Sequence, residues 1–144
     1  MDKPQFVYVV YIATTPEKLW EALTSGEFTQ KYWGGRKIQS DWKVGSPVKH
    51  VKDDGSSDWE GEVLQCDPPR LLSYTFHAPG EKQEQPSRVV FELEPNGSTV
   101  KLTLTHDELD EKSFMVISRG WSAILSSLKS LLETGNPLIF AAWK

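Results

Sequence analysis

Hydrophobic and polar positions follow two different periods, each confined to its own part of the chain. Residues 6–12 form a dense run of aromatic and β-branched side chains, which is typical of a strand. From residue 36 to residue 105, apolar and polar side chains alternate within short segments separated by turns rich in glycine, proline and aspartate. Residues 115–132 instead repeat apolar side chains mainly at spacings of three and four, which predicts one long helix.

Two short helices are predicted between the first strand and the alternating region. Thr15 can cap free backbone N–H groups, Pro16 suits the first helical position, and Glu17 favours the positive end of the helix dipole. Apolar spacing then continues through residues 28–33 and stops at two consecutive glycines. The long helix has its own stop signal, a glycine at position 135 followed by a proline at position 137.

The alternating region predicts a sheet with one face in water and the other face covered. The apolar stripe of the long helix is broad enough to lie across a concave sheet, so the helix is the expected cover. We therefore predict an α+β fold in which a curved antiparallel sheet of six to seven strands grips a long C-terminal helix. Beyond the first strand, the expected strands span residues 36–40, 46–52, 57–66, 72–76, 89–94 and 100–105, with a polar loop over 78–86.

Composition narrows the classes of protein that fit this chain. Its 144 residues are expected to form a single domain, 1–144. The net charge is −4 and lysine and arginine do not cluster, which argues against nucleic-acid binding. No apolar stretch is long enough to insert in a membrane, the N-terminus lacks the pattern of a secretory signal, and Cys66 has no partner for a disulfide. These features favour a cytoplasmic protein.

Several sequence segments together resemble one family. They are residues 12–24, 31–34, 61–76, 105–106 and 120–129, and they extend over nearly the whole chain. The order of the predicted elements, a strand, two short helices, a run of strands and one long helix, resembles the helix-grip fold of the SRPBCC superfamily, which includes START domains, the birch-pollen allergen group and polyketide cyclases. The resemblance is closest to the domain of heat-shock-protein-90 ATPase activator homologues. It implies a chaperone partner or a stress-response role as one possible function, whereas the fold by itself does not decide the function.

The histidines are the first candidates for chemistry. His50, His77 and His106 lie on different predicted strands or strand ends without the close pairing of metal ligands, so no metal or cofactor is expected. The parity of His106 places it on the inward face with Val100, Leu102 and Leu104, near the mouth of the expected cavity. It is either a hydrogen-bonded structural histidine or a polar group that orients a ligand or transfers a proton.

The aromatic residues are the second candidates, because six tryptophans are many for this length. They either fill an ordinary core or line a pocket, since one helix against a strongly curved sheet leaves space that side chains do not fill. Trp42 and Trp59 lie in more polar surroundings and are candidates for an exposed patch that meets a partner. The expected ligand-binding residues that line the cavity are Tyr74, Phe76, Phe91, Leu102, Leu104, His106 and Trp121.

Three functions are consistent with these observations. The leading one is binding of a small apolar or amphipathic ligand between the sheet and the helix. The second is a protein-partner role, with a chaperone as the partner implied by the resemblance, and the chain itself is expected to be a monomer or a homodimer. The third is an enzyme of cyclase, hydratase or hydrolase type, for which His106 with Tyr74 or an adjacent acid is the candidate acid–base pair. Because no such pair is forced by spacing, no catalytic residue is assigned and an enzyme is the less favoured reading.

Overall fold

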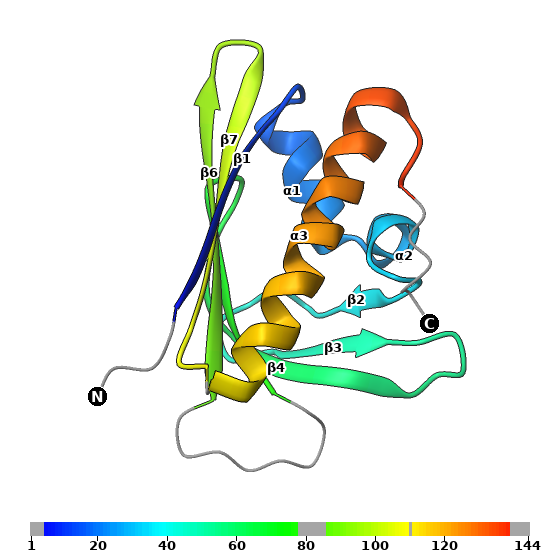
Figure 1. The fold of residues 1–144 in the computed structure, drawn as a ribbon, viewed down its shortest axis with the longest axis vertical. Helices are drawn as coiled ribbons and strands as arrows, with labels where there is room; N and C mark the ends of the chain where they lie inside the picture. The colour runs from blue at the N-terminus through cyan, green and yellow to red at the C-terminus, as the bar shows by residue number, and fades with distance from the viewer. Residues whose placement is uncertain (1–4, 78–85, 110, 139–144) are drawn as a thin grey trace.

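The structure is a computed structural model that describes residues 5–77, 86–109 and 111–138 (Figure 1). Most of the predicted polar loop over 78–86 lies outside these residues. The elements follow one another as β1 (Phe6–Ile12), α1 (Pro16–Thr24), α2 (Gly26–Tyr32), β2 (Lys37–Gln39), β3 (Pro47–Val51), β4 (Ser57–Asp67), β5 (Leu71–Phe76), β6 (Ser87–Asn96), β7 (Thr99–Asp107) and α3 (Glu111–Thr134).

The strands form one antiparallel sheet of seven strands in the order β1-β7-β6-β5-β4-β3-β2. The helix-grip prediction is confirmed, because α3 lies across this sheet and the two short helices follow β1 (Figure 1). The predicted parity is also correct. Residues 100, 102, 104 and 106 of β7 are all buried, while the residues between them are only partly covered.

The sheet changes direction at β4, and two residues of this strand, Asp58 and Trp59, line a pocket. Register shifts occur between His50 and Val51 and between Val63 and Gln65. Between these two irregularities, Gly61 lies so close to β5 that an added Cβ would be 1.7 Å from the carbonyl oxygen of Thr75. Irregularities of this kind bend a strand and increase its twist. As a result β2, β3 and the first half of β4 pass beneath α3 instead of continuing the plane of β5, β6 and β7 (Figure 1).

The helix ends agree with the predicted signals. The side chain of Thr15 accepts a hydrogen bond from the backbone N–H of Lys18 at 3.2 Å, and Pro16 occupies the first turn of α1. Gly135 has a φ of +86° and its N–H donates to the carbonyl of Leu131 at 2.9 Å, which ends α3. One part of the predicted apolar stripe is wrong, because Met115 is 58% exposed. The covered part of the stripe begins at Ile117.

None of the helices in the described part of the chain combines the length and apolar character needed to cross a membrane.

Candidate functional site: an aromatic pocket beneath α3

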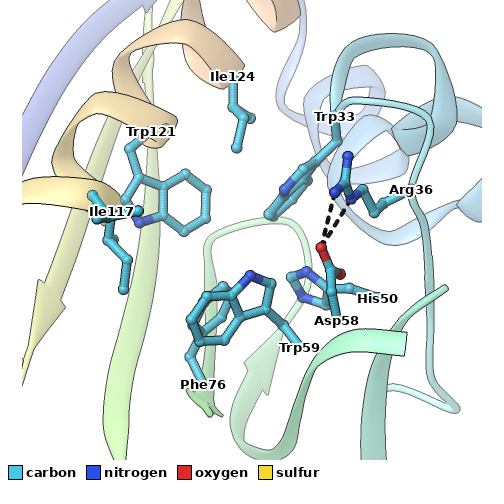
Figure 2. Close-up of a pocket in the computed structure, with 11 residues that line it drawn as sticks. Trp33, Arg36, His50, Asp58, Trp59, Phe76, Ile117, Trp121 and Ile124 are labelled. Carbon is cyan, nitrogen blue, oxygen red and sulfur yellow. Dashed lines mark hydrogen bonds and ion pairs between the residues drawn. The ribbon is translucent and has the colours of Figure 1, made fainter. Parts of the chain in front are cut away.

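A pocket with a volume of about 320 Å³ lies between α3 and the bent part of the sheet (Figure 2). Its size is at the lower end of the range for small-molecule sites in proteins. α3 provides one wall, and the other walls come from the end of α2, the segment before β2, and strands β3, β4 and β5. The lining residues are Trp33, Arg36, His50, Asp58, Trp59, Phe76, Val116, Ile117, Gly120, Trp121 and Ile124.

Four large aromatic side chains belong to the apolar wall. The rings of Trp33 and Trp121 meet edge to face with centroids 5.1 Å apart. Trp59 stacks on Phe76 with centroids 4.5 Å apart and an angle of 27° between the ring planes. These are the geometries that aromatic pairs prefer, so each pair holds its rings in a defined orientation. The wall is therefore formed by mutually supported rings and not by single flexible side chains.

The wall from α3 follows directly from helical spacing. Ile117, Trp121 and Ile124 lie three or four residues apart and therefore on one face. Gly120 lies among them in the middle of the helix, where glycine destabilises by about 0.5–1 kcal/mol relative to alanine. An added Cβ at Gly120 would meet no atom of a neighbouring element within 4 Å. The glycine thus leaves open space at the edge of the pocket.

An ion pair lies on the side of the pocket away from α3 (Figure 2). The Nε and Nη2 atoms of Arg36 both donate to Oδ2 of Asp58, at 3.1 and 2.9 Å, and Nη1 donates to the carbonyl of Gly34 at 2.7 Å. Each charged side chain is 26% exposed. The pair gives the aromatic pocket one polar side, which carries one positive and one negative charge.

His50 lies on the same polar side and is buried. Its Nε2 atom is 3.3 Å from the hydroxyl of Tyr74, and its ring packs edge to face against Trp33 with centroids 5.0 Å apart. Burial, assisted by the positive charge of Arg36, lowers the pKa of His50 to about 3, so the ring is neutral at physiological pH. Within the described residues, the buried side-chain polar atoms that lack a hydrogen-bond partner are His50 Nδ1 and Asp58 Oδ1.

His106 is held by hydrogen bonds on both sides of its ring. The indole N–H of Trp121 donates to Nδ1 at 2.9 Å. Since Nδ1 accepts, the neutral ring carries its hydrogen on Nε2, which lies 2.9 Å from Oγ of Ser87. That hydroxyl donates onward to the carbonyl of Phe76. Burial lowers the pKa of His106 to about 4, which keeps the ring neutral. His106 therefore orients Trp121, one of the aromatic walls, and both of its nitrogens are occupied.

The seven residues predicted to line the cavity fall into three groups in the structure. Phe76 and Trp121 line the pocket. Tyr74 and His106 are absent from the lining and are each hydrogen-bonded to a residue that does line it, His50 and Trp121 respectively. The remaining three residues are buried in the core and do not contribute to the lining: Phe91, Leu102 and Leu104.

Sequence reasoning missed the polar side of the pocket and underestimated Trp59. The predicted exposed patch of Trp42 and Trp59 is wrong, because both side chains are partly buried against the core. Trp42 donates its indole N–H to the carbonyl of Thr24 at 2.9 Å, and Trp59 lines the pocket. The sequence does show a polar and an aromatic residue next to each other on a strand, Asp58 and Trp59. This pattern does not reveal that the strand bends beneath α3.

The described residues show how the candidate acid–base pair and the possible metal ligands are placed. The candidate pair of His106 and Tyr74 is not joined by a hydrogen bond, since Tyr74 meets His50 and His106 meets Ser87 and Trp121. In the ranges that the structure describes, no group of three or more histidine, cysteine, aspartate or glutamate side chains is placed to hold a metal ion.

The family with the description "Activator of Hsp90 ATPase homolog 1-like protein" matches residues 13–133. The chain belongs to this family. The match extends from the end of β1 to the last turn of α3 and thus includes every element that lines the pocket. No curated protein matches the sequence.

Several solved structures have the same fold as this chain. The Aha1 dimer from Colwellia psychrerythraea is 25% identical, with 92% of this chain and 98% of that chain covered and a TM-score of 0.77. A protein from Cytophaga hutchinsonii is 28% identical, with 92% and 95% covered and a TM-score of 0.73. An HSP90 activator from Plasmodium falciparum is 20% identical, with 89% and 95% covered and a TM-score of 0.74. At 20% identity the last of these supports the fold alone.

Proposed function

We propose that this protein binds a small amphipathic molecule with a flat, ring-like apolar part in the pocket beneath α3. The observation that carries the proposal is the pocket itself, a space of about 320 Å³ bounded by four aromatic rings and one ion pair. Aromatic walls favour a planar apolar group, and a few polar groups on one side fix the orientation of a ligand. The mid-helix Gly120 adds to the argument, because it keeps space open at a cost in helix stability.

Intrinsic fluorescence is a direct test, since Trp33, Trp59 and Trp121 all line the pocket. We expect naphthalene and 2-naphthol, as probes of the proposed shape, to bind with one-to-one stoichiometry and to change the tryptophan emission. Replacing Trp42, which is outside the pocket, by phenylalanine should leave that change intact. Native mass spectrometry of the protein purified from cells should also show a bound small molecule. No bound molecule, together with no spectral change in water saturated with naphthalene or at millimolar 2-naphthol, would contradict the proposal.

A protein-partner role is the second candidate, and the family match favours it. Within this proposal, the partner is a chaperone of the type named in the family description. Binding of the purified protein to the chaperone from the same cell, followed by an ATPase assay, tests it. An unchanged ATPase rate together with no binding at micromolar concentration would remove this candidate.

A second copy of the chain is a further proposed partner. The Colwellia psychrerythraea relative is described as a dimer, and it aligns with this chain over nearly its whole length. Sedimentation over a range of protein concentrations measures whether this chain also pairs with itself.

A further inference from the structure

β1 has the properties of a sheet edge that is open to another strand. It pairs only with β7 among the described strands, from Phe6 opposite His106 to Ile12 opposite Val100. In an antiparallel ladder, alternate residues direct their N–H and C=O groups away from the neighbouring strand. Half of the backbone groups of β1 therefore face away from the sheet and can pair with another strand.

The composition of β1 makes this edge unusual. Natural proteins usually protect an edge strand with charged residues, proline or a bulge. The seven residues Phe-Val-Tyr-Val-Val-Tyr-Ile contain no charge, no glycine and no proline, and their register with β7 is continuous. Val7 and Val9 are 52% and 48% exposed on the outer face of the sheet. Nothing in the sequence of the strand therefore opposes pairing.

Charged side chains do close one end of the edge. Lys129 donates from Nζ to the carbonyl of Tyr11 at 2.7 Å, and Glu133 accepts from the backbone N–H of Ala13 at 2.8 Å. The two side chains also form an ion pair with each other at 2.6 Å. The C-terminal end of β1 is therefore covered by α3, and among the described residues the stretch of the edge that remains uncovered is residues 6–10.

We propose that residues 6–10 of β1 pair antiparallel with the same residues of a second copy of this chain. This inference rests on the proposed pairing with a second copy and adds the surface that forms it. With the two-fold axis at Tyr8, Val7 lies opposite Val9 of the partner subunit and Phe6 lies opposite Val10 of the partner subunit. Cross-strand pairs of β-branched and aromatic side chains stabilise a ladder.

A second copy fits this edge better than a strand of arbitrary sequence does. When two copies of a strand pair across a two-fold axis, each copy faces the same set of residues that it contains itself. β1 contains no charged residue, so this pairing brings no like charges together. A short edge buries less than the roughly 800 Å² per partner that a standard stable interface buries. The dimer is therefore weak, with a dissociation constant on the order of 10⁻⁵ M.

Sedimentation equilibrium between about 1 and 500 μM protein, a range centred on the expected dissociation constant, tests the inference. The wild type should change from monomer to dimer over this range. Val9→Lys should weaken the dimer at least tenfold, because the lysine cannot be matched in the uncharged strand it meets. The matched control is Val44→Lys in the turn before β3, where the valine is 71% exposed and distant in sequence from β1. This control should leave the dimer unchanged, and both variants should melt within a few degrees of the wild type.

Mixing two variants then tests the register. Val9→Lys mixed with Val7→Glu should restore dimers, because the two new charges lie opposite each other when the axis is at Tyr8. A protein that remains a monomer at every concentration would remove the proposed pairing with a second copy altogether. A dimer that Val9→Lys does not weaken would retain that pairing but overturn β1 as its surface. Rescue by Val9→Glu in place of Val7→Glu would overturn the register.

Discussion

Replacing Gly120 by alanine separates the stability of the protein from its capacity to bind. The residue lies in the middle of α3 and lines the pocket, and an added Cβ would meet no neighbouring element within 4 Å. Alanine has a higher helix propensity than glycine because it loses less backbone conformational freedom on folding. The difference stabilises a helix interior by about 0.5–1 kcal/mol. For a domain of this length, a gain of this size raises the melting temperature by about 2–4 °C.

The same substitution reduces the pocket. A methyl group occupies nearly the ~30 Å³ share of one water molecule. This is roughly a tenth of the volume of about 320 Å³. We therefore expect Gly120→Ala to weaken binding of naphthalene several-fold and Gly120→Leu, which fills more of the space, to weaken it more than tenfold. Thermal unfolding and fluorescence titration of the same preparations measure the two effects.

Gly135→Ala is the matched control for this substitution. An added Cβ at Gly135 also meets nothing within 4 Å, but its φ of +86° is strained for alanine. The control should therefore lose about 1 kcal/mol and leave binding unchanged. A loss of stability in Gly120→Ala would show that the space at residue 120 is filled. Unchanged binding in Gly120→Leu would show that the probe does not occupy this pocket.

Three further predictions concern the residues that support the pocket. Gly61→Ala should destabilise the protein by about 3 kcal/mol in urea unfolding, because its Cβ would overlap the backbone of Thr75; a cost below 1 kcal/mol would mean that the strands separate easily. His106→Phe should cost about 1–3 kcal/mol in the same assay, because the N–H of Trp121 loses its acceptor inside the core, and a cost near zero would refute the structural role of the ring. The pKa values of His50 and His106 in the folded state, about 3 and about 4, are below the unfolded value of about 6.5. Their contribution to stability is therefore complete above pH 6.5 and is lost as the pH falls, down to about pH 4 for His106 and about pH 3 for His50. For His106 this loss is about 3 kcal/mol, and it should be absent from the pH dependence of His106→Phe.

Much of the fold could be predicted because its signals are local. The caps of α1 and the stop of α3 depend on single residues, Thr15 and Gly135, whose conformational preferences do not require the rest of the chain. The inward face of β7 was evident from alternation alone, since a strand buried on one face must alternate. His106 was correctly placed inside for the same reason.

Only two of the residues that line the pocket, Phe76 and Trp121, were predicted to line it. Phe76 and Trp121 belong to segments whose period shows that they face inward. Trp59 and Asp58 belong to a strand with mixed polarity, and their position depends on how β4 bends near Gly61. Periodicity reports which side of a strand is covered, but it contains no information on how strongly the sheet curves.

The sequence by itself determined the order of the elements, the inward face of the sheet and the apolar face of α3, because each depends on residues close together in the chain. The tertiary structure alone decided which aromatic rings surround open space and which fill the core. It also brought Arg36 and Asp58, 22 residues apart, into an ion pair beside that space. The physical reason is that a cavity is the volume left between packed elements, and this volume depends on long-range curvature and contact that no local pattern encodes.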